Sequence, residues 1–136
     1  MNLHIKNNQV LSVDQCKELL ALGLDMSDSF FIWEYTNGQH LAFVSVNRLT
    51  KDEESYFLLC HTYTLQEILE KLPAHLPNKI DAELFVSMTD EKKGYVAYAD
   101  YTGDGVYYYH EEIGSDLLEA AFNMLKWCIG KKCITM

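Results

Sequence analysis

The sequence predicts an α+β domain with a mainly antiparallel sheet of about six strands and about three helices packed on one face. Three segments combine helical spacing of apolar residues with recognisable caps, and several others alternate apolar and polar residues. The helices and strands do not alternate regularly along the chain, which argues against a parallel α/β fold. A length of 136 residues fits one domain, so we expect a single domain over 1–136.

The first expected helix begins after Ser12. Ser12 and Gln15 have the spacing of a capping box, and Leu11 with Cys16 has the spacing of a hydrophobic staple. Gly23 is the expected left-handed terminator, with Leu24 folding back behind it. The spacing predicts one broad core-facing side made of Cys16, Leu19, Leu20 and Leu22.

A β-hairpin and a third strand are expected next. The hairpin strands are 29–35 and 40–46, joined by Asn37-Gly38, a pair that favours a type I′ turn. The charged segment 51–54 is expected to be an exposed loop, followed by a strand over 56–61.

The second expected helix covers 64–72. Thr64 and Glu67 form a second capping-box pattern, and Pro73 ends the helix at Leu72. Apolar residues recur with helical spacing along one narrow side, which predicts a core-facing stripe of Leu65, Ile68, Leu69 and Leu72.

A three-stranded meander is expected over 80–88, 95–101 and 106–111. In the first of these strands one side is wholly apolar, which predicts a buried face of Ile80, Ala82, Leu84, Val86 and Met88. A last helix is expected to begin with Ser115 as N-cap and to end at Gly130.

The charge excludes two classes of partner. The formal net charge is −9 and Arg48 is the only arginine, so neither nucleic acid nor an anionic membrane is expected to bind. Residues 1–6 lack the apolar core of a signal peptide, and we therefore expect a cytoplasmic protein. In that compartment the four cysteines are expected to be reduced.

No motif predicts a metal, a cofactor or a catalytic centre. Cys16, Cys60 and Cys128 are interpreted as core residues, and Cys133 as exposed. His110-Glu111-Glu112 lacks the second histidine of a zinc-protease motif. Residues 100–111 match part of a calcium-binding EF-hand loop, but strand patterns flank them, so a β-turn explains them equally well and calcium binding stays open.

The most unusual feature is the interval 94–125. It contains no Lys or Arg, carries six acidic residues and holds six of the nine tyrosines. Tyrosine is enriched at protein interfaces because it combines a large apolar area with a polar group. The pattern therefore predicts an interaction surface for a basic protein, and we assign to it Tyr95, Tyr98, Asp100, Tyr101, Asp104, Tyr107, Tyr109 and Glu111.

Two segments carry a family resemblance. Residues 63–73, YTLQEILEKLP, resemble a recurring Y-T-L-Q-[DE]-I-L-x-x-L-P string, and residues 117–129 resemble a recurring L-x-x-A-x-x-M-L-x-W string. Both strings occur in small proteins of phage- and mobile-element-rich gut bacterial genomes. The resemblance covers about the last three-fifths of the chain and implies a fold family without implying an activity.

The leading functional hypothesis is a non-enzymatic, inhibitor- or immunity-like protein that acts by contact with a basic partner. Two alternatives are kept. The first is a small-molecule-binding or metal-dependent enzyme with a pocket between sheet and helices, using polar groups from Cys60, His61, His75 and His110. The second is a self-associating structural protein, such as a homodimer formed through the sheet.

Overall fold

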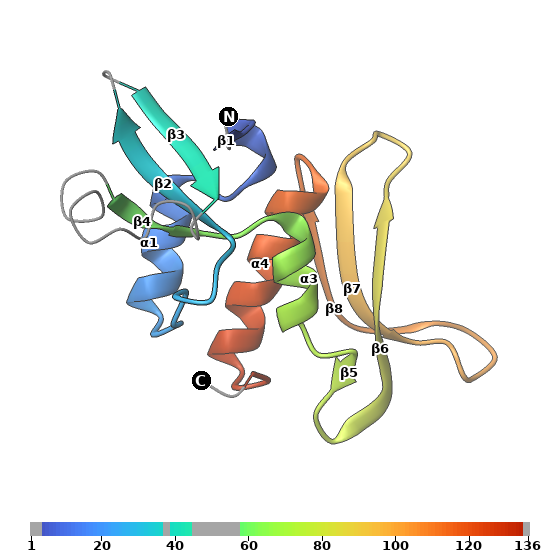
Figure 1. The fold of residues 1–136 in the computed structure, drawn as a ribbon. Helices are drawn as coiled ribbons and strands as arrows, with labels where there is room; N and C mark the ends of the chain where they lie inside the picture. Colours follow the sequence, from blue (N-terminus) through green and yellow to red (C-terminus); the bar gives the residue numbers. More distant parts are fainter. Residues whose placement is uncertain (1–3, 37–38, 45–57, 135–136) are drawn as a thin grey trace. The chain divides into compact units, whose positions relative to one another are not determined.

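The computed structural model describes residues 4–36, 39–44 and 58–134 and has the predicted α+β class (Figure 1). The strands pair antiparallel, as predicted, but they form two four-stranded sheets instead of one. The described chain falls into two compact units, one through Glu67 and one from Ile68 onward. The prediction of a single domain is not tested by this division and stays a prediction.

The first unit holds a sheet with the strand order β1-β3-β2-β4. Helix α1 packs against β4, so one helix lies on this sheet. The elements of this unit are β1 (His4–Ile5), a 3-10 turn (Asn7–Gln9), α1 (Val13–Ala21), β2 (Phe31–Thr36), β3 (Gln39–Val44) and β4 (Leu58–Thr62).

Both predicted ends of α1 are confirmed. The Gln15 amide donates to the Ser12 hydroxyl over 3.1 Å, and the Ser12 amide donates to the Gln15 side chain over 2.9 Å. At the other end Gly23 has a φ of 94°, and the Leu24 amide donates to the Leu19 carbonyl over 3.1 Å. This pattern is the Schellman motif, which satisfies carbonyls that the helix end leaves open.

The apolar side of α1 is narrower than predicted. Cys16 and Leu19 are fully buried, whereas Leu20 and Leu22 are 46% and 43% exposed. Leu20 and Leu22 follow the buried Leu19 by one and three positions near the end of the helix. The contact side therefore covers about one helical stripe and not the broad face that the sequence predicts.

The hairpin of β2 and β3 agrees with its prediction in register. Thr36 pairs with Gln39, which leaves two residues for the connection. Those residues, Asn37 and Gly38, lie outside the described part of the chain, as does the predicted loop at 51–54. The predicted strand at 56–61 is observed as β4, beginning at Leu58.

The second unit holds a sheet with the order β5-β6-β7-β8. Helix α4 packs along β7 and β8, and it is drawn in red beside the orange β8 in Figure 1. The boundary between the units falls inside α3, whose Thr64–Glu67 capping box is confirmed. The remaining elements are α3 (Leu65–Lys71), β5 (His75–Leu76), β6 (Lys79–Met88), β7 (Gly94–Asp100), β8 (Tyr107–Gly114) and α4 (Leu117–Gly130).

The caps of α4 differ from the prediction by one or two residues. Asp116, not Ser115, is the N-cap, and its carboxylate accepts the Glu119 amide over 2.8 Å. At the other end the left-handed residue is Lys132, with a φ of 58°, and not Gly130. The Cys133 amide donates to the Cys128 carbonyl over 2.8 Å, so the helix closes in a Schellman motif without glycine.

Two glycines bring α4 against the sheet. Gly94 on β7 pairs with Gly114 on β8, and both are buried. A Cβ on Gly94 would lie 2.2 Å from the Asp116 carbonyl oxygen, and one on Gly114 would lie 2.5 Å from the Ala120 amide nitrogen. Backbone therefore meets backbone where α4 begins, at a distance that no larger residue permits.

The predicted apolar face of β6 is only partly buried. Ala82 is fully buried, but Val86, Met88 and Ile80 are 39%, 56% and 71% exposed. Helix α4 makes its contacts mainly with β7 and β8, so the outer positions of β6 are not covered to the same degree. The alternation predicts the strand correctly and overestimates its burial.

Candidate interaction surface

The β6–β7–β8 sheet presents one side to α4, and the opposite side carries the exposed Tyr101 and Tyr108. Tyr98 lies on the α4 side, since its ring centre is 6.4 Å from that of Trp127. Neighbouring residues on a strand point to opposite sides, so Ala97 and Ala99 lie on the other side. We call that side the tyrosine face. Its central residues are Phe85, Tyr95, Tyr101, Tyr108, Glu111 and Ile113.

Aromatic rings cover the centre of the tyrosine face. Ala97 and Ala99 have no exposed surface although no helix of this unit packs on this side in the described residues. The rings of Phe85 and Tyr101 meet edge to face with centroids 4.3 Å apart. The interaction with Tyr108 is the main cause that raises the pKa of Tyr101. Small residues in the middle strand thus let larger side chains from β6 and β8 close over them.

Tyr95 and Glu111 form a polar pair on the same face. The Tyr95 hydroxyl donates to the Glu111 carboxylate in a short hydrogen bond. Burial, followed by this bond, raises the pKa of Tyr95. The residues lie on adjacent strands at diagonal positions, since Glu111 pairs with Ala97 and Tyr95 pairs with Ile113. A charged oxygen is thereby fixed beside an aromatic ring at the surface.

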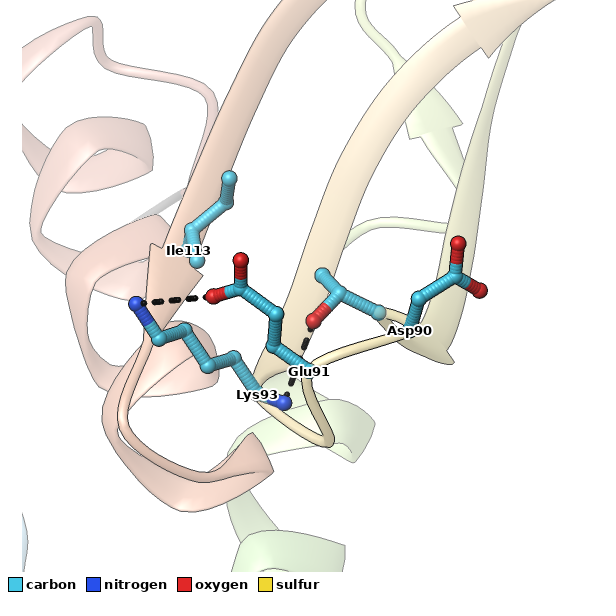
Figure 2. Close-up of a pocket in the computed structure, with 5 residues that line it drawn as sticks. Asp90, Glu91, Lys93 and Ile113 are labelled. Carbon is cyan, nitrogen blue, oxygen red and sulfur yellow. Dashed lines mark hydrogen bonds and ion pairs between the residues drawn. The ribbon is translucent and has the colours of Figure 1, made fainter.

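The tyrosine face is acidic between two basic ends. Asp81 and Glu83 are exposed on alternate positions of β6, and Glu83 pairs with Ala99. With Glu111, they place three carboxylates on this side of the sheet. Lys79 stands at one end of β6, and Lys93 lies beside Ile113 at the other end (Figure 2).

Tyr98 does not belong to the surface that the sequence predicts. It is fully buried, its hydroxyl donates to the Pro73 carbonyl over 2.7 Å, and burial raises its pKa. Tyr95 and Tyr98 are three positions apart on one strand, an odd separation that places them on opposite sides. The alternation of side chains along the strand is therefore enough to assign Tyr95 and Tyr98 to different sides of the sheet.

The other predicted residues divide between the face and the β7–β8 loop. Tyr95, Tyr101 and Glu111 lie on the tyrosine face. Asp100 lies at the start of the loop and accepts a hydrogen bond from the Thr102 hydroxyl and another, over 2.8 Å, from the Thr102 amide. Both bonds lower the pKa of Asp100, and the bond from the hydroxyl has the larger effect. Asp104 is exposed further along the same loop.

Tyr107 and Tyr109 form a separate aromatic pair after the loop. Their ring centroids are 4.7 Å apart, and the Lys79 ammonium lies 4.6 Å above the Tyr109 ring. A β-bulge opposite Tyr98 and Ala99 makes Tyr109 the extra residue of β8. Bulges turn side chains away from the regular alternation, so this pair does not continue the tyrosine face.

The sequence prediction missed three members of the tyrosine face. Phe85, Tyr108 and Ile113 supply much of its exposed apolar surface, with Tyr108 46% and Ile113 56% exposed. Phe85 is the one apolar residue among the alternate positions of β6 that are otherwise polar, and this exception could have identified it as a member of the face. Tyr108 shares its side with Ala99 only because of the bulge, which has no sequence signature here.

The partial calcium motif is not assembled as a loop site. Asp100 is engaged with Thr102, while Glu111 is engaged with Tyr95 on the opposite side of the sheet. Within residues 4–36, 39–44 and 58–134, no three His, Cys, Asp or Glu side chains form a group able to hold a metal ion. His110 instead stacks on Trp127, with centroids 4.1 Å apart, and its Nε2 pairs with Glu112.

The residues named for an enzyme do not converge in one unit. Cys60 is buried on one side of β4, and His61 on the other side bonds the Ser29 hydroxyl at 2.9 Å. A shallow hollow lies elsewhere, at the turn between β6 and β7, and its lining includes Thr89, Glu91 and Lys93 (Figure 2). Lys93 pairs with Glu91 at 3.4 Å in this hollow. None of Cys60, His61, His75 or His110 lines it.

Burial of the cysteines agrees with their interpretation as core residues. Cys16, Cys60 and Cys128 are buried, whereas Cys133 is half-buried and not exposed. Among the described residues, none belongs to a helix long and apolar enough to cross a membrane.

Comparisons with protein-family models, with curated proteins and with solved structures find no match.

Proposed function

We propose that the chain is a non-enzymatic protein-binding module that recognises a basic partner through the tyrosine face. The observation that carries this proposal is the pair of half-buried Tyr95 and exposed Glu111 beside the packed rings of Phe85 and Tyr101. Aromatic side chains held in place lose little conformational entropy on binding, which favours their use as contact residues. The inhibitor- or immunity-like role and the mobile-element setting are part of this proposal.

Charge supports a basic partner. Glu111, Asp81 and Glu83 share the tyrosine face, and the interval 94–125 has no Lys or Arg. Complementary charge speeds association and selects against acidic partners. The same carboxylates disfavour a twofold homodimer through this face, because each would approach acidic groups of the second copy. The four free thiols support a reducing compartment such as the cytoplasm.

The test compares two variants of the tyrosine face with a matched control. Glu111→Lys reverses a charge on the face, and Tyr101→Ala removes a contact ring. Glu18→Lys, on exposed α1, makes the same charge change in the other unit. We expect the first two to weaken a partner captured from the native cell by about tenfold or more, a loss of about 1.4 kcal/mol, while the control keeps full affinity.

Binding should also weaken with added salt if charge steers the encounter. Retention of every captured partner by both face variants would contradict the proposal. If the chain has the solution mass of a dimer and Glu111→Lys strengthens that dimer, the result favours the self-associating alternative. The substitution would strengthen such a dimer because it relieves repulsion between the two acidic faces.

A further inference from the structure

Two cysteines far apart in the sequence meet inside the first unit. Cys16 is on α1 and has no exposed surface, and Cys60 is on β4 with 8% exposed. The two elements pack against each other. Both residues are free thiols.

Contacts to the Leu11 carbonyl show that the Cys16 thiol lies on the side of β4 to which the Cys60 side chain points. Thr62 donates its hydroxyl to this carbonyl over 2.8 Å, and the Cys16 sulfur lies 3.9 Å from the same oxygen. Cys60 is two positions before Thr62 on β4, so its side chain points to the same side as that of Thr62. The Cys16 and Cys60 side chains therefore meet between α1 and β4, close enough to change each other's pKa.

The two sulfurs differ in their surroundings. Cys60 keeps 8% of its surface exposed and Cys16 keeps none, so Cys60 is the thiol that an oxidant in solvent reaches first. The interaction with Cys16 lowers the pKa of Cys60, burial opposes this change, and the charge of Lys17 lowers the pKa further. Exposure therefore points to Cys60 as the attacking thiol and to Cys16 as the buried partner, and the lowered pKa of Cys60 agrees, since the thiolate is the reactive form.

We propose that Cys16 and Cys60 form a reversible disulfide when a hydroperoxide oxidises Cys60. This modification site is independent of the protein-binding function proposed above. The exposed 8% of Cys60 is the only part of the pair that contacts solvent. The two thiols lie on the same side of β4 where α1 packs on it, a placement that lets the sulfurs approach each other once Cys60 is oxidised.

The chemistry balances in two steps. The Cys60 thiolate attacks one peroxide oxygen, the O–O bond breaks, and with one proton the products are Cys60 sulfenic acid and water. The Cys16 sulfur then attacks the Cys60 sulfur, displacing the hydroxyl group as a second water while Cys16 gives up its proton. Two thiols and one hydrogen peroxide thus become one disulfide and two waters, and an external thiol such as dithiothreitol reverses the oxidation by exchange.

The second unit provides an internal comparison. Cys128 and Cys133 also lie near each other, but Cys128 has no exposed surface and burial raises its pKa to about 12. Cys128 is therefore less accessible and less acidic than Cys60. We expect Cys60 to be oxidised at least about tenfold faster than Cys128.

The experiment uses the full chain carrying Cys133→Ser, which removes the half-buried thiol and leaves the proposed pair intact. After treatment with about one equivalent of hydrogen peroxide, remaining thiols are alkylated in denaturant and the chain is cleaved after lysine. We expect a linked pair of peptides, one ending at Lys17 and one ending at Lys71. Dithiothreitol should separate this pair.

Single variants test the order of steps. In Cys16→Ala the sulfenic acid of Cys60 should accumulate and be trapped by dimedone, whereas in Cys60→Ala the Cys16 thiol should resist oxidation. If either variant fails to fold, the Cys133→Ser chain alone decides. Recovery of Cys16 and Cys60 as separate alkylated peptides, or a link between two copies of the chain, would overturn the proposal.

Discussion

The indole nitrogen of Trp33 donates a 2.6 Å hydrogen bond to the carbonyl oxygen of Leu11. Thr62 donates to the same oxygen, and the Leu11 amide donates to the Tyr63 carbonyl over 3.0 Å. Leu11 precedes the N-cap of α1, while Trp33 lies on the middle of β2. One peptide group therefore connects the start of the helix to two strands of the sheet.

Trp33→Phe should lower the free energy of unfolding by about 2 kcal/mol. The substitution removes the hydrogen bond and leaves space beside a residue that is 4% exposed. Urea unfolding followed by circular dichroism measures the change. Tyr107→Phe, at a site that is 63% exposed, is the control and should shift stability by no more than about 0.5 kcal/mol. Equal effects of both variants would argue against the role of the Leu11 carbonyl.

Gly94→Ala should destabilise the chain by about 3 kcal/mol, because the added Cβ would overlap the backbone of Asp116. Gly105→Ala is the matched control, since nothing lies within 4 Å of its added Cβ and stability should hold or rise by up to about 1 kcal/mol. Thermal unfolding of the two variants beside the parent chain gives the comparison. A Gly94→Ala chain as stable as the parent would show that α4 can retreat from the sheet.

Stability should fall at alkaline pH. Burial is the main cause that raises the pKa of Tyr63, Tyr95 and Tyr98 in the folded chain. The unfolded chain loses these hydroxyl protons near pH 10, whereas the folded chain keeps them to a higher pH. Their contribution to the free energy of unfolding is therefore complete below about pH 10 and is lost as the pH rises above it. Urea unfolding between pH 8 and pH 11 (about three units) measures the slope.

Tyr98→Phe should make that alkaline slope shallower, because one buried hydroxyl no longer distinguishes the folded from the unfolded state. Tyr107→Phe removes a hydroxyl from a side chain that is 63% exposed and serves as control. An unchanged slope in Tyr98→Phe would assign the alkaline loss to other groups.

The Cys16–Cys60 disulfide, once formed, should raise the free energy of unfolding by about 4 kcal/mol. The link would close a loop of about 45 residues, and closing such a loop reduces the conformational entropy of the unfolded chain. Urea unfolding with and without dithiothreitol, on the oxidised Cys133→Ser chain, measures the difference. Confirmed oxidation with no rise in the unfolding midpoint would mean that the bond strains the folded unit by as much as it restricts the unfolded one.

Helix boundaries were predictable from the sequence where the signal is local. The capping boxes of Ser12 with Gln15 and of Thr64 with Glu67 involve residues three positions apart, and both are observed. At α4 two adjacent residues were able to cap, and the sequence pattern alone does not distinguish Asp116, which caps, from Ser115. The division into two sheets could not be predicted, because it depends on pairings between distant segments.

The candidate surface was predicted in part. Composition located the interval 94–125, but composition does not distinguish the two sides of a strand. The burial of Tyr98 follows from its position three residues after Tyr95, whereas the place of Tyr108 depends on a bulge. Cys16 and Cys60 come from segments 44 positions apart (60 minus 16), so no local sequence pattern predicts that they lie together.

The paired glycines at the start of α4 also select the strand register. If β7 slipped by two residues, Val96 would replace Gly94 beneath Asp116, and a similar slip of β8 would bring Glu112 to the position of Gly114. Neither side chain fits where a single Cβ would already overlap backbone. The native alignment of β7 and β8 is therefore the one that lets α4 dock, so the contact with the helix distinguishes the correct register from shifted ones.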